Sequence, residues 1–427
     1  MVDLSWLNLL VTSTARRFRL GVGGNARYAL CGYVHPIPFL SSQIVYISTA
    51  SIAYPHHRGA VRAEVAGRLD PSNLPAGTFV LSTCLRMEIT AAGDEPDLER
   101  SLSAMLGELR ESARPDVRVG ESAVTHLFRV AAGLESPILG EQEILTQFRQ
   151  ALIRAEQEGR VGGLFAGLLE TAVAAGRRAR ELLPDSPHDS LAAVAAQVVG
   201  SADRVAVLGS GLMATAAVHG LLGLPSPPSV TVVARNPDKV AIEGVEVWPF
   251  DRAAEALSAF PAVVSATSAK RLLVDDEAMA AAVLRRTLPL TLVDMAMPPD
   301  FEPPDGAAVD YLGIDDLARM ADRRPRREDA DAFVQAAAAD THRQFVNHHR
   351  VGPVIGELMR TADAVVDRTV DRFAGRLGRG DDRAVLQQVA HTVARTLLAG
   401  PVAYLKKADR APEVVDAIAD AFDLDDD

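Results

Sequence analysis

The segment DRVAVLGSGLMATAAVHGLL, residues 203–222, constrains the fold more than any other part of this sequence. A short apolar run leads into a glycine-rich turn, Gly209 to Ala214, and a helical pattern follows. This G-x-G-x-x-A turn is typical of sites that hold a dinucleotide pyrophosphate at a helix N-terminus. A bare glycine match is weak evidence, but the flanking strand and helix supply the context that the motif requires. The segment therefore predicts a Rossmann domain.

Three further apolar runs, 229–235, 261–269 and 289–298, extend this prediction, because they are typical of buried parallel strands. Arg235 stands at the end of the first run, where an acidic residue would indicate NAD. An arginine suits the 2′-phosphate of NADP instead. The alternative interpretation of Arg235 is a solvated charge at a strand end. We expect the Rossmann domain to span residues 184–325.

The chain before this domain alternates strand and helix patterns, which indicates an α/β architecture. We expect an irregular extension over residues 1–42 and an N-terminal α/β domain over 43–183. The expected elements are strands at 43–53 and 78–84, helices at 60–69 and 98–112, and helical structure from 121 to 182 with a break near Gly133 to Gly140.

The chain after residue 325 has helical periodicity and few strand signals. A charged stretch, RRPRRED, separates it from the preceding domain, and DLDDD forms an acidic end. Long amphipathic helices after an α/β domain often build a helical arm or a dimer bundle. We expect an all-helical domain over residues 326–427.

Composition excludes several classes of protein. Of the 427 residues 48% are hydrophobic, and the two cysteines, Cys31 and Cys84, give neither a disulfide framework nor a zinc cluster, which fits a reducing cytoplasm. No apolar run reaches the roughly 18 residues that a membrane helix needs, so no membrane association is expected. The net charge of −12 argues against a broad nucleic-acid footprint but leaves room for a local basic patch such as residues 176–180. The pair His56 and His57 has no further ligands near it in the sequence, and no metal site is expected.

Cys84 follows an apolar strand pattern, with Arg86 two residues later and Glu88 two residues beyond. An isolated cysteine often packs as a small hydrophobic residue. A cysteine is also an intrinsically strong nucleophile, and adjacent positive charge favours its reactive thiolate. In an extended stretch Arg86 and Cys84 share a face. Arg86 is therefore either part of a site around Cys84 or the partner of Glu88 in a structural ion pair.

Several stretches together resemble one family, the glutamyl-tRNA reductases. The family's S-T-C-N-R-x-E motif is similar to Ser82 through Glu88, and a second family signature resembles HLFRVAAGLESPILGEQEILTQ, residues 126–147. The glycine-rich turn, VVAR, VSATSA, LVDMAMPPDFEP and LLAGPVAYLKK follow in the family's order. The resemblance covers roughly residues 45 to 410.

The resemblance implies a catalytic α/β domain, an NADPH-binding Rossmann domain and a helical dimerisation domain. It implies NADPH-dependent reduction of glutamyl-tRNA(Glu) to glutamate-1-semialdehyde through a cysteine thioester, the step that opens tetrapyrrole synthesis towards 5-aminolevulinate and haem. It further implies a cytoplasmic homodimer and a glutamate-1-semialdehyde aminomutase as a partner that receives the unstable aldehyde.

The resemblance also assigns roles to individual residues. Cys84 is the expected nucleophile, and His126 is the expected proton-transfer group, although a histidine on a helix also serves as a core or surface residue. Arg86 is the expected fork for the substrate carboxylate. The remaining substrate-binding residues are Thr83, Leu85, Ser136, Glu141, Gln142, Glu143 and Gln147, and the NADPH-binding residues are Gly209, Ser210, Gly211, Leu212, Met213, Ala214 and Arg235.

The sequence departs from the family pattern at four places. Leu85 replaces the usual asparagine and Met87 the usual threonine, and both are expected as apolar replacements near the substrate that bear on its identity. The family's G-E-P-Q block is GEQE at residues 140–143, without its proline. Ala214 replaces the last glycine of the nucleotide turn, a tolerated change.

Three alternatives to a glutamyl-tRNA reductase stay open at this point. The first is a divergent paralogue that reduces another aminoacyl-tRNA or thioester. The second is a non-catalytic regulator that binds tRNA or NADP, which would need neither a thiol, nor a fork, nor a base. The third is a shikimate-dehydrogenase-like enzyme, which accounts for the Rossmann half alone and leaves the cysteine block and the helical end unexplained.

Overall fold

The computed structural model describes residues 46–69, 74–93, 113–183, 190–269, 271–302, 308–321, 328–374, 380–406 and 412–422. Four predicted features lie outside these residues, namely the extension 1–42, the helix 98–112, the basic part of RRPRRED and the acidic end. We refer below to the antiparallel-sheet region (described residues from 46 to 183), the parallel-sheet region (from 190 to 321) and the helical region (from 328 to 422). Among the described residues no helix is long and apolar enough to cross a membrane.

The first region is built on a four-stranded antiparallel sheet in the order β2-β3-β1-β4. Its strands are β1 (Tyr46–Ala53), β2 (Thr78–Ser82), β3 (Arg86–Gly93) and β4 (Asp116–Val119). The predictions of β1 and β2 are confirmed, whereas β3 and β4 were not predicted. The side chains of β3 alternate between polar and apolar in a strand that is buried on both faces, so no apolar run marks it.

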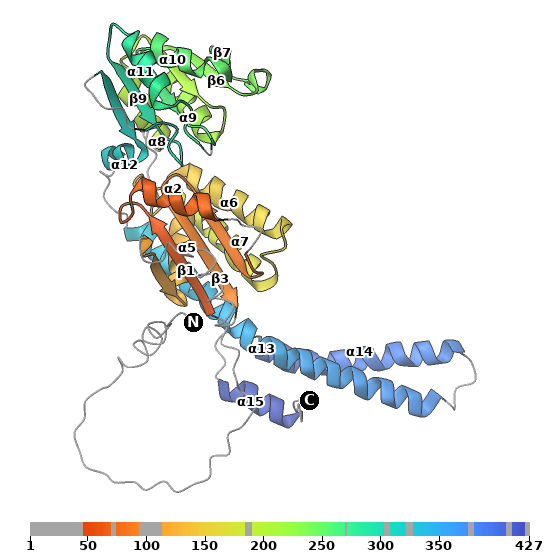
Figure 1. Cartoon of the computed structure of the whole chain (residues 1–427). Helices are drawn as coiled ribbons and strands as arrows, with labels where there is room; N and C mark the ends of the chain where they lie inside the picture. Colours follow the sequence, from red (N-terminus) through yellow and green to blue (C-terminus); the bar gives the residue numbers. More distant parts are fainter. Residues whose placement is uncertain are drawn as a thin grey trace, which may run out of the picture. The chain divides into compact units, whose positions relative to one another are not determined.

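Helices cover both faces of this sheet (Figure 1). Helix α2 (Gly59–Arg68) packs on one face, where Val65 contacts a core that includes Met87 and Ile89. The other face, with Phe79 and Leu81, packs against the larger core formed by α5 (Glu121–Ala131), α6 (Gln142–Gln157) and α7 (Gly163–Arg180). The first part of α13 (Glu328–Ala374) joins this larger core.

The second region contains a six-stranded parallel sheet in the order β10-β9-β8-β5-β6-β7. This is the strand order of a Rossmann fold, and the order reverses between β5 and β8, where such sheets bind their ligands. The strands are β5 (Arg204–Leu208), β6 (Ser229–Ala234), β7 (Glu246–Pro249), β8 (Ala262–Ser265), β9 (Leu290–Asp294) and β10 (Val309–Gly313).

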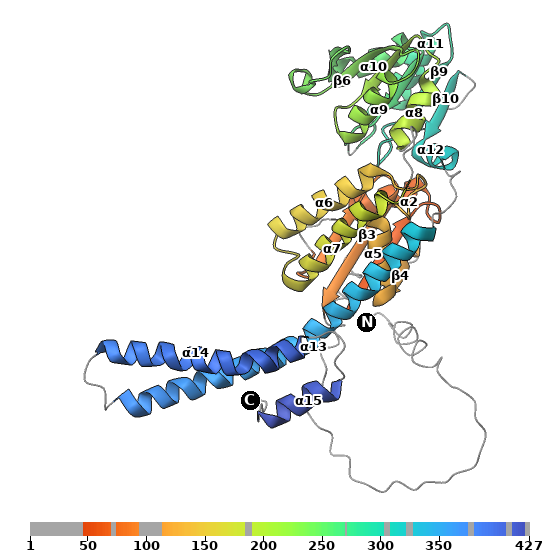
Figure 2. The same ribbon diagram turned by 180° about the vertical axis from the view of Figure 1, so that it is seen from behind.

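Helices lie on both faces of the parallel sheet (Figure 2). A separate apolar core holds the helices of each face. One core includes residues of α8, α9 and α12, and the other includes residues of α10 and α11. The predicted α/β class with a Rossmann domain is therefore confirmed, although β7 and β10 were not predicted. The helices are α8 (Leu191–Val199), α9 (Leu212–Leu222), α10 (Ala253–Ala259), α11 (Asp276–Leu284) and α12 (Ile314–Ala321).

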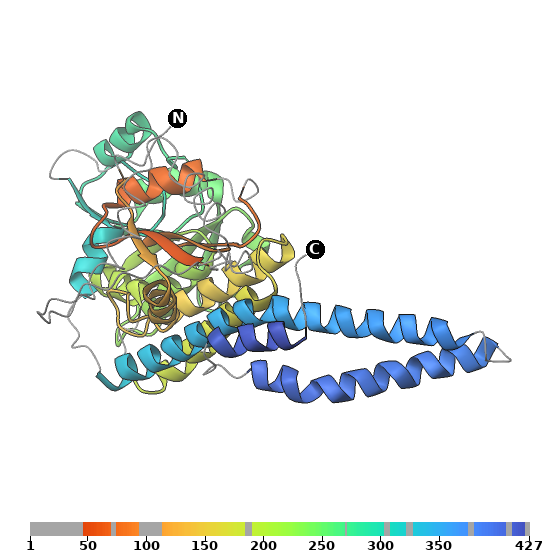
Figure 3. The ribbon, with the colours of Figure 1, turned by 90° about the horizontal axis from the view of Figure 1, so that it is seen from below.

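The third region is entirely helical in the residues that the structure describes. Helix α13 (Glu328–Ala374) is 47 residues long, and α14 (Gly380–Leu405) runs alongside its second half (Figure 3). Between the two helices, His391 Nδ1 lies 2.9 Å from Asp363 Oδ1. The short helix α15 (Pro412–Ala421) lies in the part of the chain that was expected to be helical, and it packs on α13 through Val415.

Candidate active site

Cys84 lies at the tip of the tight turn between β2 and β3. Thr83 shapes this turn, because its backbone N–H donates to the carbonyl of Arg86 at 2.8 Å and its hydroxyl oxygen accepts from the N–H groups of Leu85 and Arg86 at 3.3 and 3.2 Å. The N–H of Tyr54 holds the carbonyl of Leu85 at 2.9 Å. The backbone around the thiol is therefore fixed on both sides.

A cavity of about 720 Å³ brings the turn together with the nucleotide motif. Ser82, Thr83 and Cys84 line it from the antiparallel-sheet region. The parallel-sheet region contributes the glycine-rich turn and the segments that follow β6, β8 and β9. The lining residues named by the sequence prediction are Thr83, Cys84, Gln147, Gly209, Ser210, Gly211, Leu212, Met213 and Arg235.

The surroundings of the Cys84 thiol favour its protonated form. Burial raises the pKa of the thiol from 9.0 to about 12, and the nearby Glu141 carboxylate adds to the rise. Arg62 and Arg86 act in the opposite direction but do not compensate. Because the thiolate is the nucleophilic form, the thiol needs proton removal or a change of surroundings before it attacks.

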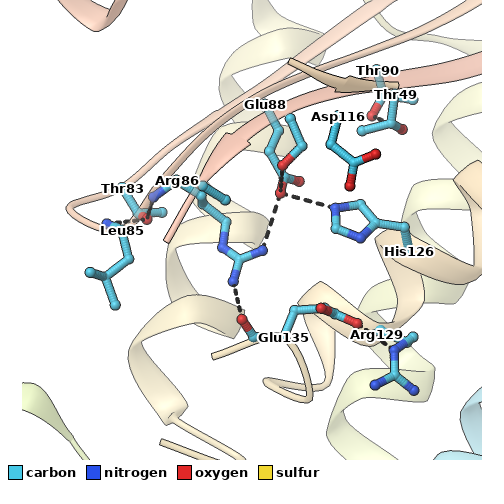
Figure 4. Close-up of polar contacts among 12 residues, drawn as sticks. Thr49, Thr83, Leu85, Arg86, Glu88, Thr90, Asp116, His126, Arg129 and Glu135 are labelled. Atoms are coloured by element: carbon cyan, nitrogen blue, oxygen red, sulfur yellow. Dashed lines mark hydrogen bonds and ion pairs between the residues drawn. The ribbon is translucent and has the colours of Figure 1, made fainter. Parts of the chain in front are cut away.

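Arg86, Glu88 and His126 form a buried network on the face of β3 that is turned towards α5 (Figure 4). Glu88 Oε1 accepts from the Ser51 hydroxyl at 2.9 Å and from Arg86 Nη1 at 3.1 Å, and it lies 3.0 Å from His126 Nε2. The second terminal nitrogen of Arg86 donates to the carbonyl of Glu135 at 2.6 Å. The expected ion pair of Arg86 with Glu88 is thus present, and it uses only part of the donor set of a guanidinium group.

The charge state of Glu88 is set by this network. Burial alone raises its pKa, but His126, Arg86 and the Ser51 hydroxyl outweigh burial and lower the pKa to about 2. Since Glu88 is ionised, Nε2 of His126 carries the hydrogen of their shared bond. His126 is not among the residues that line the Cys84 cavity; it lines a separate cavity of about 490 Å³ with Thr125 and Arg129.

The two apolar departures from the family motif, Leu85 and Met87, are both buried in apolar clusters. Met87 belongs to the core between the sheet and α2, on the face of β3 opposite Arg86 and Glu88. Leu85 is buried in the apolar cluster that contains Ile138 and the core of the parallel-sheet region. Neither side chain is among the residues that line the Cys84 cavity, and the expectation that both lie near the substrate stays a prediction.

The segment before α6 places a buried carboxyl group near Cys84. Glu141 is buried, and burial, followed by the charge of Glu143, raises its pKa to about 7. Ser136 donates a hydrogen bond to Glu141 and lowers this pKa, as do the charges of Arg86 and Arg180. Helix α6 begins at the next residue, Gln142, and brings Gln147 to the cavity.

The glycine-rich turn fits a dinucleotide phosphate. Gly209 has φ +114°, and a Cβ there would lie 2.6 Å from the carbonyl oxygen of Ala266, so only glycine is accommodated. Gly211 caps α9 in extended backbone with open space over its Cα, and the free N–H groups of the first helical turn face that space. Ala214 is buried against the sheet, where its methyl group replaces the usual glycine without a clash.

Arg235 follows β6 and lines the same cavity. Its side chain is exposed, and one terminal nitrogen donates to the Ser268 hydroxyl at 3.3 Å. This position suits a side chain that binds the phosphate on a ribose. Most of the N–H donors of Arg235 remain available for such a phosphate.

Sequence reasoning missed the residues that support the site from a distance. Asp300 accepts from the hydroxyl groups of Ser265 and Thr267, both at 2.6 Å, and so fixes the segment after β8 that lines the cavity. Arg62 binds the carbonyl of Cys84 at 3.3 Å. Asp300 stands in the predicted LVDMAMPPDFEP segment, whereas nothing near Arg62 in the sequence marks its role. Among the described residues no group of three His, Cys, Asp or Glu side chains is placed to hold a metal ion.

Comparison with known proteins identifies the family. The model described as "Glutamyl-tRNAGlu reductase, N-terminal domain" matches residues 56–182, "Shikimate / quinate 5-dehydrogenase" matches 192–320, and "Glutamyl-tRNAGlu reductase, dimerisation domain" matches 329–424. Among solved structures, glutamyl-tRNA reductase from Methanopyrus kandleri has 24% sequence identity and a TM-score of 0.47, with 88% of this chain and 97% of that chain covered.

Curated relatives give the same result. Glutamyl-tRNA reductase of Geobacillus kaustophilus is 31% identical over 368 residues, which cover 79% of this chain and 80% of that protein. Glutamyl-tRNA reductase of Moorella thermoacetica is 30% identical over 380 residues, which cover 82% and 86%. The family prediction is confirmed: this chain belongs to the glutamyl-tRNA reductase family.

Proposed function

We propose that this protein catalyses the NADPH-dependent reduction of glutamyl-tRNA(Glu) to glutamate-1-semialdehyde, the first step of tetrapyrrole synthesis. The observation that carries the proposal is the shared lining of one cavity by Cys84 and the glycine-rich turn. A thiol that forms an acyl intermediate and a site for a hydride donor must face the same space, because the acyl carbon stays on the sulfur when it is reduced.

In the proposed mechanism Cys84 Sγ attacks the ester carbonyl carbon of glutamyl-tRNA. A C–S bond forms, the C–O bond to the ribose breaks, and the released ribose oxygen takes up a proton. The nicotinamide cofactor, when bound, supplies the hydride that reduces the thioester carbon. The C–S bond of the resulting thiohemiacetal then breaks, which releases the aldehyde and restores the thiol of Cys84.

The charged groups around Cys84 hold the substrate in this proposal. Arg86 uses its remaining N–H groups for the side-chain carboxylate of the glutamyl group. Thr83 and the backbone of Leu85 border that group, together with Ser136 and Gln147. Glu141, Gln142 and Glu143, at the start of α6, complete the substrate side.

In this proposal His126 does not contact the substrate and acts through Glu88 and Arg86. It holds Glu88 from α5, and Glu88 in turn holds Arg86. A direct proton transfer from His126 to the substrate, which the sequence suggested, would need the substrate to reach beyond the residues that line the Cys84 cavity.

NADPH is the proposed cofactor, bound by residues 209–214 and by Arg235. Gly209 and Gly211 allow close approach of the pyrophosphate, and the N-terminus of α9 provides N–H donors. Arg235 provides the cation that distinguishes a 2′-phosphate from a 2′-hydroxyl group.

A homodimer is the proposed assembly. Helix α14 carries an apolar stripe at four-residue spacing that is exposed in the single chain: Val385 (60% exposed), Val389 (54%), Val393 (53%) and Leu397 (73%). Contiguous exposed apolar surface on a helix favours a partner helix. We further propose that the domains span residues 43–183, 184–325 and 326–427, and that an aminomutase takes up the aldehyde product.

A single-turnover assay tests the function. Wild type and C84S are mixed with glutamyl-tRNA and NADPH, and aldehyde and free tRNA are measured. Aldehyde from wild type and none from C84S is the expected result. NADPH binding without transfer of glutamate from tRNA in wild type would refute the proposal in favour of a binding protein. Reduction of a different aminoacyl-tRNA alone would favour a divergent paralogue.

A further inference from the structure

Arg62 is among the most deeply buried large side chains of the described chain, with 1% of its surface exposed. A buried guanidinium group is costly unless its donors are satisfied. Arg62 donates from Nη1 to the carbonyl of His57 at 2.5 Å, from Nε to the carbonyl of Cys84 at 3.3 Å, and from Nη2 to Asp315 Oδ1 at 2.5 Å. One side chain thus connects three separate segments.

Asp315 belongs to the parallel-sheet region, which contributes the nucleotide motif to the cavity. It lies in the first turn of α12, which packs in the core of the parallel-sheet region, 253 residues from Arg62 in the sequence. Its second oxygen accepts the N–H of Gly59 at 2.9 Å, so both carboxylate oxygens bind the α2 segment. The side chain of Asp315 is 31% exposed, which leaves the acidic end of the contact open to solvent.

Arg62 connects Asp315 to the backbone of Cys84. The same guanidinium group that binds Asp315 binds the carbonyl of Cys84, and the thiol of Cys84 shares a cavity with the glycine-rich turn. A displacement of α12 therefore pulls on the backbone of the nucleophile. A lysine could not make this link, because its single nitrogen cannot reach three acceptors in a planar arrangement.

We propose that Arg62 and Asp315 form a latch that positions Cys84 for the reduction step by fixing its backbone to the nucleotide-binding half of the protein. This inference rests on the proposed function. Transfer of the glutamyl group to Cys84 needs only the antiparallel-sheet region, whereas reduction needs the acyl carbon to face the nicotinamide. Both residues are positioning residues, and neither lines the Cys84 cavity among the described residues.

The test separates the two steps in D315N. Acyl transfer is followed by the release of free tRNA in a single turnover without NADPH, and reduction is followed by NADPH oxidation on enzyme that already carries the acyl group. D315N is expected to slow reduction about 10- to 100-fold, the scale of a displacement near 1 Å, and to leave acyl transfer within about threefold. The affinity for NADPH is expected to stay unchanged.

The matched control is D316N. Asp316 stands in the same turn of α12, but it binds the N–H of Gly313 at 2.9 Å and does not contact Arg62. D316N is expected to match wild type in both steps. R62K is the second test variant, and the double variant R62K/D315N is expected to be no slower in reduction than R62K alone, because both changes break one link. Thermal unfolding of each variant establishes that it is folded.

The outcomes divide cleanly. A selective loss of reduction in D315N with a normal D316N supports the latch. Equal slowing of both steps, or no slowing, overturns it. If wild type transfers no glutamate from tRNA, the proposed function fails, and alkylation of Cys84 by iodoacetamide then decides on the latch. The latch is supported if NADPH changes the alkylation rate of Cys84 in wild type and D316N but not in D315N. The latch is overturned if NADPH has the same effect on this rate in all three proteins.

Discussion

The pH dependence of Cys84 alkylation is a direct test of the site as described. Burial and the charge of Glu141 raise the pKa of this thiol to about 12, so the thiolate that reacts with iodoacetamide is scarce at pH 8. The rate constant for Cys84 is expected to rise about tenfold for each pH unit from 7 to 10. The alkylation rate constant of a free thiol, whose pKa is near 8.5, stops rising above about pH 9.

The expected size of the effect follows from two opposing factors. At pH 8 a free thiol of pKa about 8.5 is roughly one-quarter ionised, whereas a thiol of pKa about 12 is ionised to about one part in 10⁴. The thiolate population of Cys84 is therefore lower by about 2,000-fold. A more basic thiolate is a better nucleophile, and a Brønsted slope near 0.45 over about 3.5 pKa units recovers roughly 40-fold. The net expectation is a rate about 60-fold below that of a free thiol.

The assay measures incorporation of iodoacetamide at Cys84 by peptide mass spectrometry between pH 7 and 10. C84S reports on the other cysteine, Cys31, and serves as the background. E141Q removes one of the two causes of the raised pKa and is expected to react faster than wild type at pH 8. A rate that levels off near pH 8.5 in wild type would refute the raised pKa of the half-buried thiol.

Three more predictions test the surrounding groups. The pKa of Glu88 is about 2 in the folded state against 4.5 ordinarily, so its ionised form contributes about 3 kcal/mol to the free energy of unfolding above pH 4.5. This contribution is lost as the pH falls towards 2. The free energy of unfolding of E88Q, measured with urea, should lack this pH dependence. G209A should weaken NADPH binding at least about tenfold by calorimetry, because its Cβ meets the carbonyl of Ala266. R235A should weaken binding of NADPH about tenfold or more and leave NADH unaffected, and an equal loss for both would contradict the assignment.

The nucleotide half of the site could be predicted because its signal is local. The turn from Gly209 to Ala214 contains, in six residues, the conformational freedom and the helix start that a phosphate needs. Strands β5 and β6 are buried except at their first residues, so each appears in the sequence as an apolar run. Both the glycine-rich turn and the strands are therefore recognised from neighbouring residues alone, without knowledge of contacts between distant parts of the chain.

The network around Cys84 was only partly predictable, because it depends on long-range pairing. Strand β3 went unpredicted because Arg86, Glu88 and Thr90 are buried polar residues that interrupt its apolar positions, so the strand contains no continuous apolar run. The partners of Glu88 come from β1 and α5. The contact of Arg62 with Asp315 joins residues 253 positions apart, and no local pattern announces it.

The position of β3 accounts for the two apolar departures from the family motif, Leu85 and Met87. Side chains alternate across a strand, so Met87 must lie on the face opposite Arg86 and Glu88. It fills the core under α2, and Leu85 fills the cluster beside Ile138. Both side chains therefore pack in apolar clusters, apart from the buried network of Arg86, Glu88 and His126. In the proposed function the glutamyl side chain is selected by Arg86, whose side chain is held by Glu88 on one side and by the carbonyl of Glu135 on the other.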